Sequence, residues 1–181
     1  MTPTAHSIND THLLNEISVY LNEKPTHGWS EKGKDCVIKT QTKSIRNKRY
    51  SVCMAVSNKK IIDYTIVEGA LKTIKFNGFL DKITTNTQNK YTLFMDNASI
   101  HKSKLIKDNV TNKNIKLIYN IPYRSELNPI EYVFSLLRKK LQTCINSTYE
   151  NIIEIINEFK LNIDSNVLNN IFNKTMKIIK D

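Results

Sequence analysis

The chain has 181 residues, enough for one domain with a substantial core, and its apolar fraction of 40% is ordinary for a globular protein. It contains only four glycines and four prolines, which argues against a fibrous or disordered protein, and no apolar run approaches the roughly 20 residues that span a bilayer. The net charge of +10 favours a polyanionic partner such as nucleic acid, although a general bias towards Lys, Asn and Ile explains the same charge without functional meaning.

The N-terminal segment and the cysteines narrow the class of protein further. Residues 1–10 have neither a basic flank nor an apolar stretch, so they do not resemble a signal peptide, and we expect an intracellular protein. We expect these residues to form a lead-in segment before a single domain at 11–181. The three cysteines are far apart and form no CxxC pair, which argues against a zinc site or a disulfide framework.

The first part of the chain predicts three consecutive strands. Residues 13–20 alternate between two faces, with Asn15 on one face and Glu16 on the other. Residues 50–57 and 61–67 predict two further strands, joined by a polar turn of hairpin length. The connection at 22–49 carries eight Lys and Arg residues, and we expect a basic loop or a hairpin with a short strand at 36–39.

The second part of the chain alternates between helices and strands and then becomes helical. The expected helices at 70–83 and 102–109 enclose a buried strand at 91–95, and a further strand at 115–121 ends before Pro122. Three helices follow, beginning after Asn128, after Ser147 and near Val167. Consecutive strands pair antiparallel, whereas strands that alternate with helices run parallel to a neighbour. We therefore predict an α/β fold with a mixed five-stranded sheet flanked by helices and additional C-terminal helices.

Two carboxylates, Asp96 and Glu131, stand at the ends of the most informative stretch, with 34 residues between them. Asp96 follows a continuous apolar run, typical of a central strand, and ligands collect where such strands end. Each carboxylate also has a local explanation, because Asp often caps a turn and Glu131 can reach back to Asn128 at a helix start. Converging on one sheet edge, the two would suit Mg²⁺, and two such ions ~4 Å apart assist cleavage of a phosphodiester.

The motifs around these carboxylates resemble the catalytic domain of mariner-type DDE superfamily transposases. They are Phe-Met-Asp-Asn-Ala-Ser-Ile-His at 94–101 and Pro-Tyr-Arg-Ser-Glu-Leu-Asn-Pro-Ile-Glu at 122–131, and their spacing is one common in that superfamily. Asn15-Glu16 resembles the family's first acidic strand, and Gly-Trp-Ser-Glu-Lys-Gly at 28–33 resembles the Gly-Trp segment that the family has after that strand. The resemblance implies an RNase H-like catalytic domain at 11–181 and a partial chain that lacks the N-terminal DNA-binding module.

The resemblance also implies a role for each acidic position. Members of the family use an Asp, Asp, Glu triad with Mg²⁺ or Mn²⁺, and no small-molecule cofactor, to cut DNA at transposon ends and transfer the strand to a target. By motif, Asp96 is the second acid and Glu131 the third, both as catalytic residues and as metal ligands. Asn15 stands where the family has its first Asp and brings no charge, so we expect DNA transposition activity to be impaired. Glu16 points to the opposite strand face and does not replace it.

DNA is therefore the expected partner, in a nucleus or a host-cell nucleoid and not at a membrane, with a homodimer as a further option. Expected DNA contacts are His101, Lys32, Lys34, Arg46, Lys48 and Arg49, although the basic residues also suit a solvated loop and His101 suits a turn. Two alternatives stay open at this point. One is a catalytically inactive DNA-binding or interaction protein that keeps the fold. The other is an unrelated basic α/β domain, in which the carboxyls of Asp96 and Glu131 would lie more than ~10 Å apart.

Overall fold

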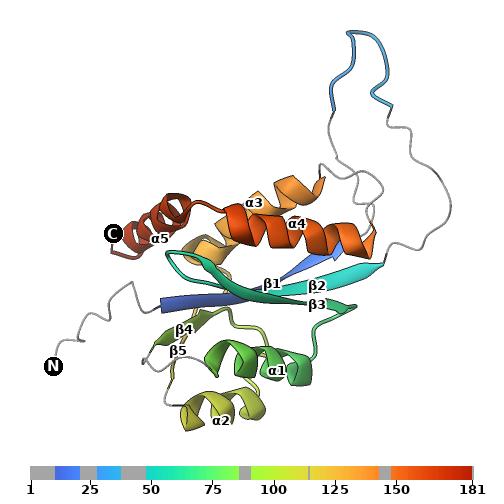
Figure 1. The fold of residues 1–181 in the computed structure, drawn as a ribbon. Coiled ribbons are helices and arrows are strands. Elements are labelled where there is room, and N and C mark those ends of the chain that lie inside the picture. The colour runs from blue at the N-terminus through green and yellow to red at the C-terminus, as the bar shows by residue number, and fades with distance from the viewer. Residues whose placement is uncertain are drawn as a thin grey trace.

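The computed structural model describes residues 11–20, 28–37, 48–85, 91–113, 115–142 and 148–180, with side chains as far as residue 175. Within these ranges one mixed sheet has the strand order β3-β2-β1-β4-β5 (Figure 1). The strands are β1 (Thr11–Tyr20), β2 (Arg49–Val56), β3 (Ile61–Glu68), β4 (Thr92–Met95) and β5 (Lys116–Tyr119).

Five α-helices of the described residues cover the two faces of the sheet. Figure 1 shows α1 and α2 on one face and α3, α4 and α5 on the other. None of these helices is long and apolar enough to cross a membrane. The mixed five-stranded sheet with flanking and C-terminal helices that we predicted is confirmed. The helices are α1 (Thr73–Thr84), α2 (Lys104–Asn112), α3 (Pro129–Gln142), α4 (Tyr149–Asn162) and α5 (Ser165–Lys180), and a 3₁₀ turn at Ser125–Leu127 precedes α3.

Strand β1 lies at the centre of the sheet and sets the position of its neighbours. It pairs antiparallel with β2 and parallel with β4, while β2 and β3 form an antiparallel hairpin and β4 and β5 run parallel. These directions agree with the prediction. The register of β1 and β4 places Leu14 beside Met95, the last residue of β4. Asp96 therefore leaves the sheet next to Asn15.

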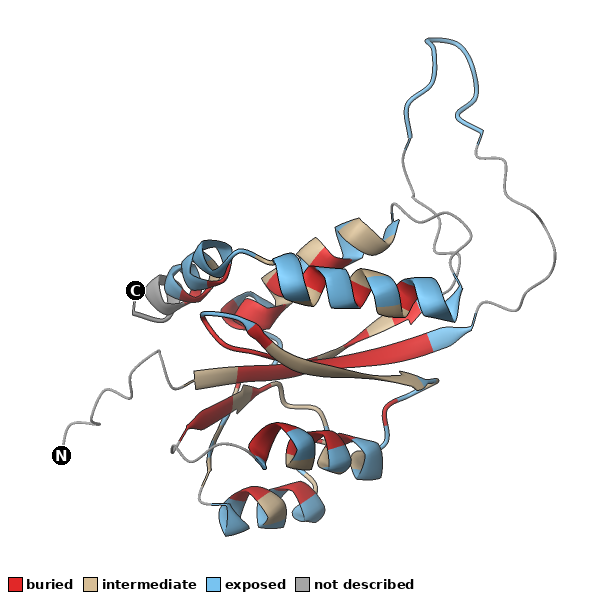
Figure 2. Cartoon of the chain, viewed as in Figure 1, coloured by how far each residue is buried: buried red, intermediate tan, exposed pale blue. Residues whose placement is uncertain are grey.

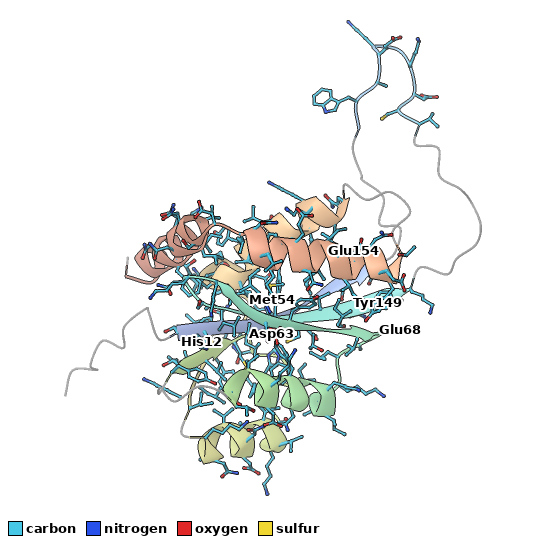
Figure 3. All side chains as sticks on the ribbon, viewed as in Figure 1. His12, Met54, Asp63, Glu68, Tyr149 and Glu154 are labelled. Atoms are coloured by element: carbon cyan, nitrogen blue, oxygen red, sulfur yellow. The ribbon has the colours of Figure 1, made fainter. Side chains whose placement is uncertain are left out.

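Alternate residues of β1 belong to two separate cores. Leu13, Ile17 and Val19 pack between the sheet and the layer of α3, α4 and α5, together with Met54, which Figure 3 labels under that layer. Leu14 packs on the other face, against α1 and α2. Figure 2 shows buried residues on both sides of the sheet. The same alternation places Asn15 on the α3 face and Glu16 on the α1 face.

Helix α3 is anchored to the sheet by its buried stripe. Ile130, Val133, Phe134 and Leu137 follow helical spacing, and none is more than 1% exposed. Burying such side chains stabilises the fold by about 1.5–3 kcal/mol each. Pro129 opens the helix, where its missing N–H costs no hydrogen bond. The stripe fixes the rotation of the helix, and that rotation decides where Glu131 points.

The local capping role considered for Glu131 is wrong. Its carboxylate does not bond the backbone N–H of Asn128, which donates instead to the carbonyl of Ser125 at 2.9 Å. The side-chain Oδ1 of Asn128 is buried and has no hydrogen-bond partner among the described residues. Glu131 is consequently available for a contact outside its own helix.

Two predicted elements differ from the structure. In the predicted strand at 36–39, residues 36 and 37 are irregular and exposed, while 38–39 lie outside the described residues. They belong to the segment 28–37, which projects beyond the sheet in Figure 1. The helix predicted at 70–83 begins only at Thr73, because a turn at Gly69 comes first. Gly69 has φ 78, donates its N–H to Arg49 O at 2.8 Å and accepts from Ser51 Oγ.

The edge strand β3 is covered by a charged cluster. Asp63 accepts from Lys82 of α1 at 2.7 Å and from Lys160 of α4 at 3.0 Å. The two helices lie on opposite faces of the sheet, so the lysines approach one carboxylate from both sides of the edge; Figure 3 labels Asp63 on this strand. The edge strand at the other end of the sheet, β5, has only four residues.

We expect Leu137→Ala to lower the free energy of unfolding by about 2–5 kcal/mol, because the side chain is fully buried between α3 and the sheet. The matched control is Leu161→Ala on α4, where the leucine is 81% exposed and the expected change is within about 0.5 kcal/mol. Urea denaturation followed by circular dichroism measures both. Equal losses from the two variants would contradict the packing of α3 against the sheet.

Candidate active site

A pocket of about 400 Å³ opens where β4 ends, and its lining includes both Asp96 and Glu131. Asp96 comes from the loop after β4, and Glu131 comes from the first turn of α3. Residues 120–125, in the loop that follows β5, also line the pocket. The structure thus brings together the two carboxylates that the sequence singled out, at the sheet edge where we expected them.

Asn15 reaches the same site from β1 and forms a hydrogen bond with Glu131. Its side chain is 3% exposed, and Nδ2 donates to Glu131 Oε1 at 2.9 Å. Its Oδ1 accepts the backbone N–H of Glu16 at 2.8 Å. An ionised Asp in this place would have no hydrogen to donate to Glu131. The amide therefore links the central strand to α3 in a way that a carboxylate does not.

Asp96 is held by its own loop and by His101. Its Oδ1 accepts the Ala98 N–H at 2.9 Å and lies 2.7 Å from His101 Nδ1. The bond from Ala98 is the local turn contact considered from the sequence, and it coexists with a place in the pocket. Burial alone would raise the pKa of Asp96, but the bonds from His101 and Ala98 and the nearby charge of Lys102 lower it below its ordinary value. Asp96 is therefore ionised at neutral pH.

His101 is fixed on several sides and is fully buried. Its backbone carbonyl accepts from the Tyr119 hydroxyl at 3.0 Å, and its ring lies 4.5 Å from the ring of Phe76. The side chain of His101 is not exposed in this structure, and its expected contact with DNA stays a prediction. Its contact with Asp96 orients that carboxylate.

Glu131 has the opposite shift in pKa to Asp96. Burial raises the pKa of Glu131 and the negative charge of Asp96 raises it further, while the charge of Arg138 and the bond from Asn15 act in the other direction. Glu131 therefore takes up a proton more readily than Asp96 as the pH falls. Two neighbouring carboxylates that differ in this way are a common feature of functional sites.

Glu16 lies close to the site but on the other face of the sheet, as its parity predicted. Burial raises the pKa of its carboxyl, which also experiences the charges of His101 and Asp96. Its Oε2 is buried and has no hydrogen-bond partner among the described residues. Asn15 and Glu16 are on opposite faces of one strand, so Glu16 does not take the place of a carboxylate at position 15.

The basic residues expected to contact DNA are spread over two regions. Lys32 and Lys34 are exposed in the segment 28–37, where Lys34 forms an ion pair with Glu31. At the start of β2, Lys48 lies 3.2 Å from Glu68, and Arg49 Nε donates to Ser18 Oγ at 3.1 Å. Arg46 lies outside the described residues. The contribution of these residues to DNA binding stays a prediction.

Two basic residues near the carboxylates were not assigned from the sequence. The charge of Lys102 acts on Asp96, and that of Arg138 acts on Glu131. Arg138 follows Glu131 by seven residues in α3, which places both on the same helix face. This spacing was visible in the sequence. It indicates a cation near the site only once Glu131 is known to line the pocket. The two cations are near enough to the carboxylates to lower their pKa values.

The donor set fits one oxygen-bound divalent cation better than two. Carboxylates suit Mg²⁺ and Mn²⁺, and Mg²⁺ typically uses one or two of them together with waters and substrate phosphates. The described hydrogen bonds use Oδ1 of Asp96 and Oε1 of Glu131, leaving the second oxygen of each without one. Across the described part of the chain, no group of three or more His, Cys, Asp or Glu side chains is arranged to hold a metal ion.

The fold and the pocket define an RNase H-like α/β domain with acidic residues where its central strands end. The sequence profile described as DDE superfamily endonuclease matches residues 13–156, and the chain belongs to this family. This membership excludes the alternative of an unrelated basic α/β domain. No curated protein matches the chain significantly.

Solved structures of the Mos1 transposase share the fold. The Mos1 strand transfer complex has a TM-score of 0.79 at 15% identity and covers 93% of this chain and 52% of that chain. The Mos1 mariner paired end complex with Mn gives the same TM-score and identity, and 53% of that chain is covered. The isolated catalytic domain of the Mos1 mariner transposase has a TM-score of 0.69 at 13% identity, covering 93% and 78%. The chain thus spans about half the length of the first two proteins.

We expect Asn15→Asp to lower the free energy of unfolding at pH 7 by about 1–3 kcal/mol, because it removes the donated hydrogen bond and places a second carboxylate against Glu131. The new charge raises the folded-state pKa of the pair further, so the folded protein binds a proton more tightly than the unfolded one. The loss is full above that folded-state pKa and shrinks as the pH falls towards the ordinary Glu value of 4.5. Urea denaturation at a series of pH values measures it.

The matched control exchanges the two groups, in the double variant Asn15→Asp with Glu131→Gln. It restores one amide and one carboxylate with donor and acceptor reversed, so most of the stability at pH 7 should return. Equal stability of the single variant and the wild type at every pH would show that the hydrogen bond between Asn15 and Glu131 contributes nothing.

Proposed function

We propose that this chain is a transposase-type or integrase-type catalytic domain that acts on DNA and whose metal-dependent strand cleavage and strand transfer are impaired. The observation that carries the proposal is the bond between Asn15 and Glu131. Two carboxylates line one pocket, while an amide occupies the place of the first Asp in the family resemblance. Family membership, and a fold shared with Mos1 complexes whose names include strand transfer, support DNA as the substrate.

In this proposal Asp96 and Glu131 would hold Mg²⁺ or Mn²⁺ together with a DNA phosphate. The positive charge of a bound cation would favour activation of a water or hydroxyl and stabilise the leaving oxygen. His101 and the Ala98 N–H keep Asp96 ionised and oriented towards this task. Glu131 has a raised pKa and gains from a nearby positive charge, which favours its ionised form.

Asn15 is the weak point of the site in this proposal. Its Oδ1 already accepts a hydrogen bond from the Glu16 N–H, and its Nδ2 donates one to Glu131 Oε1, so both ends of the amide are engaged. It also brings no negative charge to a cation. Removing an outer hydrogen-bond partner from a metal site typically costs about 10–100-fold in affinity or activity. Replacing a direct ligand should cost at least as much.

A second candidate function is a DNA-binding or interaction protein that keeps the fold without catalysis. The amide at position 15 and the net charge of +10 favour it as well. This function needs salt-sensitive DNA binding but no cation at Asp96 and Glu131. Under either function the protein would act at DNA, in a nucleus or a host-cell nucleoid, and a homodimer belongs to the same proposal, in line with relatives solved as paired end complexes.

We expect the wild type to nick supercoiled DNA slowly or not at all in Mn²⁺, and Asn15→Asp to nick it about 100-fold faster, because the variant restores a charged ligand. The control Asn15→Asp with Glu131→Ala should be inactive, since it removes the other carboxylate. Gel electrophoresis of the nicked product measures the rates. Robust cutting by the wild type, abolished by Glu131→Ala, would contradict the impairment. Inactivity of every variant would favour the non-catalytic function.

We expect Lys102→Ala and Arg138→Ala each to reduce the slope of log affinity against log salt by about one, because each removes one phosphate contact beside the pocket. Lys60→Ala, in the exposed turn between β2 and β3, is the matched control and should leave the slope unchanged. Fluorescence anisotropy of a labelled duplex over a series of salt concentrations measures it. Unchanged slopes for Lys102→Ala and Arg138→Ala would place the DNA elsewhere on the surface.

A further inference from the structure

The loop at 120–125 lines the same pocket as the two carboxylates and carries an unusual residue. Tyr123 is 104% exposed and has φ 62, and no other non-glycine residue of the described ranges has a positive φ. This backbone conformation is unfavourable for a bulky side chain. Tyr123 is also one of the residues that line the pocket of Asp96 and Glu131, so its exposed side chain belongs to the border of that site.

The surrounding loop is held firmly at both ends. Asn120 is 8% exposed; its N–H donates to Met95 O at 2.7 Å, and its carbonyl accepts from the Asn97 side chain. Its side-chain Nδ2 donates to Arg124 O at 2.8 Å, so one buried amide closes the loop over Tyr123. Arg124 is in turn paired with Glu126. These bonds maintain the strained backbone of Tyr123, and strain of this kind accumulates at sites of function.

The ring is placed to meet something outside the protein. An exposed aromatic ring contributes little to the core, and the strained backbone makes its position costly to maintain. Ile121, 58% exposed, lies two residues before it, and Pro122 comes between them, so this rim of the pocket is apolar. The charges of Lys102 and Arg138 act on the carboxylates of the same pocket. An apolar rim with an exposed aromatic ring, beside a cationic and acidic centre, matches a nucleotide, with its base on Tyr123 and its phosphate inside.

We propose that Tyr123 is a stacking platform for an unpaired nucleobase adjacent to the phosphate that enters the pocket. The inference rests on the proposed function, because the base and the phosphate belong to the same DNA strand. Every nucleobase has a face that stacks on an aromatic ring, so the contact positions the strand with little preference for sequence. Tyr123 is thus a positioning residue and takes no part in the chemistry, which the proposed function assigns to Asp96 and Glu131.

The test uses duplex DNA with 2-aminopurine at an unpaired terminal position, and a second duplex with the probe paired in the interior. Stacking quenches the fluorescence of the probe, so the wild type should quench the unpaired probe much more than the paired one. Tyr123→Gly suits the positive φ and keeps the loop while removing the ring. It should abolish this quenching and weaken binding of the unpaired DNA by about 5- to 150-fold, leaving affinity for blunt duplex within about twofold.

Two controls separate the ring from other changes. Tyr123→Phe keeps the ring and loses the hydroxyl, so it should quench like the wild type. Leu161→Ala removes an exposed apolar side chain of α4, outside the pocket, and should also quench like the wild type. Urea denaturation shows whether Tyr123→Gly folds, and its stability should equal or exceed that of the wild type because the backbone strain is relieved.

The outcomes distinguish this inference from the proposed function. Quenching that persists in Tyr123→Gly, or that is lost in Tyr123→Phe, would overturn the stacking role. Salt-sensitive binding by the wild type without selective quenching would also overturn it, while leaving DNA as the substrate. Absence of any DNA binding by the wild type would reject both. Selective quenching that follows the ring through the three variants would support the platform.

Discussion

The register between β1 and β4 is the constraint on which the site depends. β4 is only four residues long and ends beside Leu14, so Asp96 emerges next to Asn15. The buried stripe of α3 then presents Glu131 to the same point, where one hydrogen bond joins residues 116 positions apart. A slip of one residue in β1 would exchange Asn15 for Glu16 and separate these groups. Packing of both strand faces prevents that slip, because Leu13 and Leu14 are each buried in a different core.

The pocket is supported from both faces of the sheet. On the α3 side, Asn15 and Glu131 share a hydrogen bond; towards α1, buried His101 lies against Phe76 and holds Asp96. This division explains why the two carboxylates differ in acidity. Burial acts to raise the pKa of both, but Asp96 receives hydrogen bonds from His101 and Ala98 that outweigh it, whereas Glu131 receives one amide. The amide at position 15 stabilises the folded arrangement in the absence of a cation, and in the proposed function the same amide weakens the chemistry.

Much of the fold could be predicted from the periodicity of the sequence, whereas only part of the site could be predicted from it. The alternation at 13–20 and the apolar run at 91–95 identified β1 and β4, because strand period and turn signals agree there. The motifs around Asp96 and Glu131 predicted their convergence. Local reasoning failed for Glu131. Its carboxylate does not bond the start of its own helix and instead accepts a hydrogen bond from Asn15, and no local sequence pattern encodes such a tertiary contact. Local reasoning also missed the positive φ of Tyr123, since tyrosine has no tendency towards it and the hydrogen bonds that close the loop around it, from Asn120 to Arg124 and from Arg124 to Ile121, are not visible in the sequence.

The charged cluster on β3 bears on how copies of this domain assemble. An open edge strand invites another strand to pair with it, and natural sheets discourage this with lysines and with short edges. Here Lys82 and Lys160 converge on Asp63 along one edge, and the other edge has only four residues to offer. Growth of the sheet from one molecule into the next is therefore disfavoured at both ends. Pairing of two copies through the described helices or loops would leave the central strands, and with them the pocket, in the same register whether the domain is alone or assembled.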